Sequence, residues 1–105
     1  MAEITLTSAN FDAETSEGTI LVDFWAPWCG PCQAMLPVVA ELAAEFADRA
    51  KVGKINIDEE PELAQKFGVM SIPTFKVFKD GSEVASITGG VAKEALTAEI
   101  EKALA

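Results

Sequence analysis

Both cysteines of the chain lie in the segment Trp28-Cys29-Gly30-Pro31-Cys32. Two thiols separated by two residues can form and break an intramolecular disulfide, so their spacing suits redox chemistry. The segment follows an apolar run and precedes a helical pattern, so we expect the cysteines at the start of a helix. There, unpaired N–H groups and the positive end of the helix dipole favour a thiolate over a thiol at Cys29.

Other interpretations of the two cysteines are half of a metal site, a structural disulfide and two inert core residues. The chain contains no histidine, and two thiolates alone cannot complete a tetrahedral zinc site. A disulfide that closes so small a loop would stabilise the fold little. We therefore favour a redox dithiol in which Cys29 attacks. Cys32, one turn further into the helix and less exposed, resolves the mixed disulfide, and Gly30 and Pro31 shape the turn between them.

Asp23 is the second unusual residue, because it interrupts the apolar segment from Ile20 to Trp25. An ionised carboxylate buried without a partner costs several kcal/mol, so the group should stay protonated to unusually high pH. The alternative is a carboxylate paired for structural reasons, for example with Lys54. We favour a functional role, in which Asp23 takes the proton from Cys32 and Lys54 tunes Asp23.

Three further positions are candidates for the surroundings of the cysteines. Trp28 precedes Cys29 and is interpreted as a lid that shields the sulfur and contacts a substrate, with core packing as the alternative. Ile72-Pro73-Thr74 leads into a predicted strand, where a trans proline is the commoner case. Gly89-Gly90 is a turn by default, and a glycine there would also let a partner backbone approach closely.

The elements that must position these residues alternate along the chain. Apolar periodicity predicts strands over residues 4–6, 20–25, 52–57, 74–78 and 83–88. It predicts helices over residues 8–14, 32–46, 61–67 and 92–104. Asp80-Gly81 marks a hairpin between the last two strands. We therefore predict an α/β protein, with one domain over residues 1–105 and a mixed central sheet of about five strands covered on both faces.

Composition narrows the classes of partner. The chain has 105 residues and a net charge of −9, which argues against nucleic acid and anionic membranes. The acidic residues are spread out, as on an ordinary solvated surface. The start of the chain lacks a basic and apolar leader, and no apolar run approaches the length of a membrane span, so we expect a soluble cytoplasmic monomer. In a reducing cytosol, a cysteine pair is more often catalytic or metal-binding than structural.

The chain resembles the thioredoxin family in several motifs that occur in the same order. They are residues 22–32, with the buried aspartate and the cysteine segment; residues 54–58, with the lysine; residues 67–69 and 72–75, where the family keeps a cis proline facing the cysteines; the hairpin at residues 80–81; and Gly89. Each motif is modest by itself, but together they are highly specific and cover essentially the whole chain.

The resemblance implies a thioredoxin fold, a central sheet flanked by four helices, and a protein-disulfide reductase. Cys29 would be the nucleophile, Cys32 the resolving thiol and Asp23 the proton acceptor. Gly30 and Pro31 would help to set a reducing potential. The substrate groove would be formed by Trp28, Ile72, Pro73 and Gly89. A flavin-containing thioredoxin reductase that uses NADPH would supply electrons, because the sequence has no cofactor motif of its own.

The sequence departs from the family at Gln33, where a lysine or arginine is common, and at Met70, where relatives often have a polar or basic residue. The first change removes a positive charge near the thiolate, and the second makes the groove more apolar. Residues 11–18 also look shorter and less apolar than the family's first helix. Two other functions remain open: a redox-independent binding subunit with this fold, and an oxidant or isomerase of an oxidising compartment.

Overall fold

The computed structural model describes residues 3–105, which form a five-stranded sheet and four helices. The strands are β1 (Ile4–Thr5), β2 (Thr19–Trp25), β3 (Lys51–Asn56), β4 (Thr74–Lys79) and β5 (Ser82–Thr88). The helices are α1 (Phe11–Thr15), α2 (Gly30–Glu45), α3 (Pro61–Lys66) and α4 (Lys93–Leu104). Met1 and Ala2, which belong to the segment used to predict the absence of a leader, lie outside the described residues.

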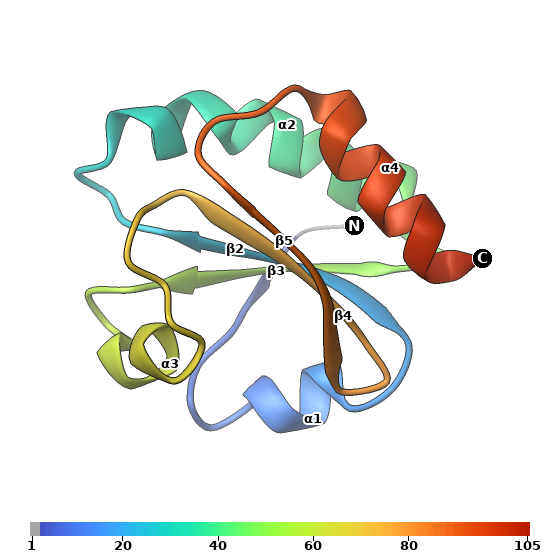
Figure 1. Ribbon diagram of the computed structural model, residues 1–105, viewed down its shortest axis with the longest axis horizontal. Coiled ribbons are helices and arrows are strands. Elements are labelled where there is room, and N and C mark those ends of the chain that lie inside the picture. The colour runs from blue at the N-terminus through green and yellow to red at the C-terminus, as the bar shows by residue number, and fades with distance from the viewer. Residues whose placement is uncertain (1–2) are drawn as a thin grey trace.

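The strands follow the order β1-β3-β2-β4-β5, and the sheet is mixed, as predicted. β1, β3 and β2 are parallel, whereas β4 runs antiparallel to β2 and β5 antiparallel to β4. Figure 1 shows α2 and α4 on one face of the sheet and α1 and α3 on the other. Among the helices of residues 3–105, none combines the length and apolar character needed to cross a membrane.

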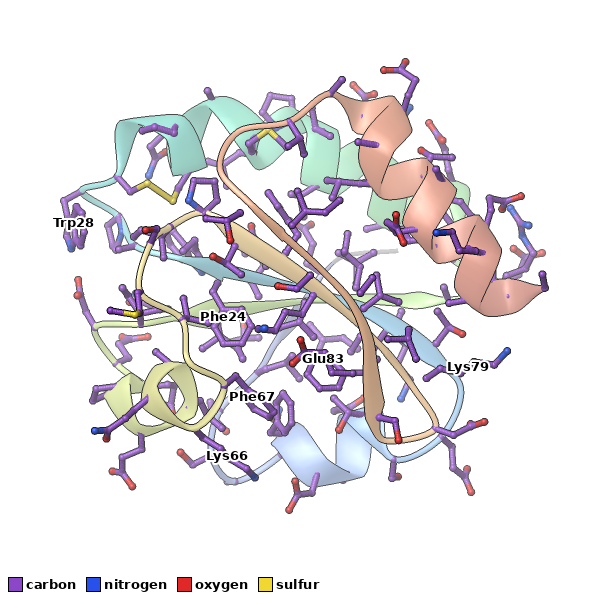
Figure 2. All side chains as sticks on the ribbon, viewed as in Figure 1. Phe24, Trp28, Lys66, Phe67, Lys79 and Glu83 are labelled. Atoms are coloured by element: carbon purple, nitrogen blue, oxygen red, sulfur yellow. A yellow bond between two sulfur atoms is a disulfide. The ribbon has the colours of Figure 1, made fainter. Side chains whose placement is uncertain are left out.

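Strand β2 lies in the middle of the sheet and is covered on both faces, which explains its nearly continuous apolar sequence. Leu21 packs into the core beneath α2 and α4. Val22 and Phe24 point to the opposite face and pack beside Phe11 of α1 and Leu63 of α3. On that face, four phenylalanine rings stack edge-on or tilted, and Phe24 and Phe67 are labelled in Figure 2. Side-chain alternation along β2 therefore places Asp23 on the α2 face.

The first helix differs from its prediction. The helix was predicted over residues 8–14, with Ser8 at its start, but α1 begins at Phe11 and ends at Thr15. The Ser8 backbone N–H and hydroxyl both donate to the Glu60 carboxylate at 2.8 Å, so Ser8 does not cap the helix. The chain instead turns once between Thr7 and Asn10 before the helix starts. Between β4 and β5, Asp80 and Gly81 have φ values of 49° and 88° and form the predicted hairpin turn.

Gly53 allows β1 and the segment after it to approach β3 closely. A β-carbon placed on Gly53 would lie 2.6 Å from Leu6 Cδ1 and 2.9 Å from Leu6 Cγ. Leu6 is 1% exposed and has no free space to move into. We expect Gly53→Ala to lower the free energy of unfolding by about 1–3 kcal/mol, measured by urea denaturation. Gly90→Ala is the control, because a β-carbon there meets nothing within 4 Å; equal midpoints for the two variants would contradict the expectation.

Candidate functional site

The two cysteines form a disulfide at the first turn of α2, with their Cα atoms 5.2 Å apart. Cys29 is the N-cap residue of the helix, and its sulfur accepts a hydrogen bond from the Cys32 backbone N–H at 3.2 Å. Pro31 occupies the first turn, where a missing N–H leaves no helical hydrogen bond unmade. The predicted helix entry is thus confirmed, and Cys29 Sγ lies where helix N–H groups stabilise negative charge.

The disulfide is more enclosed than the sequence suggested. Cys29 is 4% exposed and Cys32 is 2% exposed, so the expected difference in accessibility between them is very small in this oxidised form. Both pack with Ala26, and the side chains of Ile57 and Ile72 lie against this cluster. The cover therefore comes from apolar residues of the loops after β3 and before β4, which sequence patterns near the cysteines do not reveal.

Trp28 lies beside the disulfide and is 68% exposed. Figure 2 shows its ring at the outer edge of the molecule, next to the yellow disulfide at the start of α2. The indole N–H donates to Asp58 Oδ2 at 2.9 Å. The alternative of core packing is therefore wrong for Trp28, and an acceptor from the loop after β3 holds this exposed ring. Asp58 did not stand out in the sequence as a site residue, because its only signal was its place just beyond the predicted strand over residues 52–57.

The segment before β4 passes directly over the cysteines. The Ile72-Pro73 peptide bond is cis, as the family resemblance implied and the residues alone did not. The Ile72 carbonyl oxygen lies 3.8 Å from Cys29 Sγ. Gly89 has a φ of 97°, which favours glycine, and its N–H donates to the Pro73 carbonyl at 2.8 Å. The structure thus brings three of the four predicted groove residues, Ile72, Pro73 and Gly89, to one side of the disulfide.

Asp23 is 2% exposed, and its Oδ1 atom has no hydrogen-bond partner among the described residues. Burial raises the pKa of this carboxyl from 3.8 to about 7; Lys54 lowers it and Glu3 raises it by their charges. Trp25 lies two residues further along β2, therefore on the same face, and packs against the disulfide cluster. Asp23 therefore faces the side of the sheet on which Cys32 lies.

Lys54 is the register partner of Asp23 on the neighbouring strand β3. Its ammonium does not form an ion pair with Asp23 among residues 3–105, so the structural alternative of an Asp23–Lys54 pair is not observed. Lys54 Nζ instead lies 3.8 Å from Glu3 Oε1 and 4.9 Å from the centroid of the Trp25 ring. Glu3 was not singled out from the sequence.

The two departures from the family pattern have visible consequences. The Gln33 amide donates to the Pro27 carbonyl at 3.0 Å and so ties the first turn of α2 to the loop before Cys29. Met70 is 95% exposed. It lines a shallow groove with Ile57, Val69 and residues of α3, and Ile57 also contacts the disulfide cluster. An apolar surface is therefore continuous with the site at this position.

Within residues 3–105, no group of three or more cysteine, aspartate or glutamate side chains could hold a metal ion. The chemistry of the site must be judged from the disulfide, the buried carboxyl and the exposed indole. A disulfide at a helix N-terminus beside a carboxyl of raised pKa can exchange with other thiols and disulfides and can transfer a proton.

Comparison with known proteins agrees with this chemistry. The family model "Thioredoxin" matches residues 2–102. The thioredoxin of Bacillus subtilis (strain 168) is 52% identical over 104 residues, which cover 99% of this chain and 100% of the relative. Thioredoxin 1 of Synechococcus elongatus is 48% identical and covers 94% of both chains. The thioredoxin of Staphylococcus saprophyticus is 49% identical over 99% of this chain and 100% of its own.

Proposed function

This chain belongs to the thioredoxin family, and we propose that Cys29 is the nucleophile with which it reduces disulfides in other proteins. The chain is a thiol-disulfide oxidoreductase that acts as a protein-disulfide reductase, and a redox-independent binding subunit is not favoured. The single observation that supports the role of Cys29 is its place as the N-cap of α2, where its sulfur accepts a backbone N–H.

The first step begins from the reduced dithiol. The Cys29 thiolate attacks one sulfur of the substrate disulfide, a Cys29–substrate disulfide forms, and the second substrate sulfur leaves as a thiolate. The N–H groups at the start of α2 stabilise the attacking thiolate before this step. Trp28, Ile72, Pro73 and Gly89 would form the groove that receives the substrate. Ile72, Pro73 and Gly89 lie together on one side of the disulfide, where the Ile72 carbonyl oxygen contacts the Cys29 sulfur.

In the second step, Cys32 attacks Cys29 Sγ, the mixed disulfide breaks and the substrate leaves with both sulfurs reduced. Two electrons pass from the dithiol to the substrate, and the chain is left with the Cys29–Cys32 disulfide seen here. Asp23 accepts the Cys32 proton, since a carboxyl with a pKa of about 7 exchanges protons near neutral pH. Lys54 tunes Asp23 by lowering that pKa through its charge.

Gly30 and Pro31 contribute by setting the turn between the sulfurs and therefore the reduction potential of the pair. A flavin-containing thioredoxin reductase would return the disulfide to the dithiol with electrons from NADPH. We further propose a cytoplasmic monomer in which residues 1–105 make up one domain. The family supports disulfide substrates and a reductase partner in general.

Insulin reduction tests the proposal directly. The chain is expected to accelerate the reduction of insulin by dithiothreitol, and by NADPH with a thioredoxin reductase, because each returns the dithiol after every turnover. The control is a Cys29→Ser/Cys32→Ser double variant, which keeps the fold but cannot exchange electrons. No acceleration by the unaltered chain would overturn the proposal, and equal biological activity of the double variant would favour a binding subunit.

Asp58 offers a test of the lid role of Trp28. Asp58→Ala removes the acceptor of the indole N–H and should leave the exposed ring mobile. We expect kcat/KM for insulin to fall about fivefold, which corresponds to about 1 kcal/mol for one hydrogen bond. Fluorescence anisotropy should report the freed indole. Glu59→Ala removes the same charge from the next residue and is the control; if it matches Asp58→Ala, the hydrogen bond is not responsible.

A further inference from the structure

Three charged side chains come from two neighbouring strands and from the residue that directly precedes a third strand. Glu3 directly precedes β1, Lys54 belongs to β3 and Asp23 belongs to β2, and these strands are adjacent in the sheet. Asp23 and Thr5 are both register partners of Lys54, which places the start of β1 across β3 from Asp23. Charges on adjacent strands at this spacing interact strongly when they are shielded from water.

The Lys54 ammonium contacts Glu3, at the start of β1, and Trp25, on β2. It lies 3.8 Å from Glu3 Oε1, and these two side chains are 24% and 20% exposed. It also lies 4.9 Å from the centre of the Trp25 ring, within reach of a cation–π interaction. Asp23 Oδ1, in contrast, has no partner among the described residues. Among residues 3–105, Lys54 is therefore paired with Glu3 and not with the buried carboxyl.

We propose that Glu3 is a positioning residue for the reaction: it pairs with Lys54, the register partner of Asp23, and thereby sets the proton affinity of the buried carboxyl. This inference rests on the proposed role of Asp23 as the acceptor of the Cys32 proton. Glu3 acts in two ways, and both strengthen the binding of the proton to Asp23. Its own negative charge opposes a second negative charge on Asp23, and its pairing with Lys54 limits the stabilisation that Lys54 gives to the Asp23 carboxylate.

Few other groups can account for the titration of Asp23. Within the described part of the chain, the charged groups that act on it are Lys54 from β3 and Glu3 from the start of β1. Its register partner on β4 is the apolar Phe75. Helix α2, which covers this face, contains Cys32, which is held in the disulfide and does not titrate in this form, and Glu41 and Glu45, which pair with Lys93. Removing the Glu3 charge should therefore change the proton affinity of Asp23 through two effects only, the loss of that charge and the release of Lys54.

The experiment is a pH titration of the Asp23 side-chain carboxyl carbon by NMR in the oxidised protein. Glu3→Gln keeps the size of the side chain, removes its charge and frees Lys54. We expect the pKa of Asp23 to fall by about half a unit or more, which is a threefold loss of proton affinity. The pH profile of mixed-disulfide resolution should move to lower pH by the same amount.

Glu17→Gln is the matched control, because Glu17 is exposed and the substitution changes the net charge equally. It should leave the pKa of Asp23 unchanged, and equal shifts in the two variants would overturn the proposal. In a Lys54→Gln background, Glu3→Gln should have a smaller effect; an undiminished shift would show that Glu3 does not act through Lys54. The NMR titration measures the pKa of Asp23 without any turnover. The role of Asp23 as proton acceptor is tested separately: if Asp23→Asn resolves the mixed disulfide at an unchanged rate, that role is wrong, whatever the titration shows.

Discussion

Replacing Cys32 with serine is expected to arrest the protein as a covalent complex with its substrate. The Cys29 thiolate remains at the start of α2, where helix N–H groups favour it, so the first exchange proceeds and releases one substrate thiolate per chain. Without the second sulfur, the mixed disulfide cannot be resolved from within the chain. Non-reducing electrophoresis and intact mass should show one substrate attached through Cys29.

Cys29→Ser is the matched variant, since it removes the other sulfur from the same turn. Cys32 lies within the first turn of α2 and lacks the N-cap position that favours a thiolate at Cys29, so it should form no adduct. We expect insulin reduction to fall by more than about a thousandfold, as for the loss of a catalytic nucleophile. An adduct on Cys32 in this variant, or full activity without Cys29, would contradict the unequal roles of the two thiols.

Replacing Asp23 with asparagine is expected to stabilise the fold at high pH. The pKa of Asp23 is about 7 in the folded chain and 3.8 in the unfolded chain. Below pH 3.8, both states are protonated and the carboxyl costs nothing. Between these values only the unfolded state loses the proton, so stability falls as pH rises, by up to about 4 kcal/mol in total. That penalty persists above pH 7.

Asp23→Asn cannot ionise and should escape this penalty. Urea denaturation at pH 8 should therefore show a more stable variant, by up to about 4 kcal/mol, whereas the two proteins should be nearly equal at pH 4. Asp12→Asn, an exposed carboxyl on α1, is the control and should leave the pH dependence unchanged. Equal stability of Asp23→Asn and the unaltered chain at pH 8 would contradict the raised pKa.

The same variant should be slower in the second chemical step. Without a carboxylate to accept the Cys32 proton, resolution of the mixed disulfide should slow by about tenfold or more at neutral pH. The pH dependence of that step near pH 7 should also disappear. Stopped-flow measurement of substrate release separates this step from the first exchange. An unchanged rate and pH profile would show that Asp23 is not the proton acceptor.

Local patterns predicted most of the fold because they report burial and turn chemistry directly. The apolar run of β2, the apolar stripe of α2 and the Asp80-Gly81 turn each have a single structural explanation, and each was confirmed. The predicted start of the first helix was wrong, because Ser8 donates hydrogen bonds to Glu60, which lies 52 residues away in the sequence. No periodicity within residues 8–14 could reveal such a partner.

The site was predictable as a set of residues but not as a set of contacts. The cysteines and Asp23 stood out because two thiols at this spacing and a carboxyl within an apolar strand are chemically unusual. The partners of Trp28 and Lys54 did not stand out, since Asp58 and Glu3 are two of many acidic residues. The cis bond before Pro73 was implied by the family alone, because isolated residues favour the trans form.

The reduction potential of the Cys29–Cys32 pair tests the central claim most directly. It is measured by equilibrating the chain with glutathione or dithiothreitol buffers and following the dithiol by mass after thiol alkylation. Thioredoxins as a class have a potential of about −270 mV, which is the reference value for this measurement. A two-electron potential near that value is the predicted result for a reductase. A potential of about −180 mV or higher, typical of isomerases and oxidants, or a disulfide that does not titrate, would contradict it.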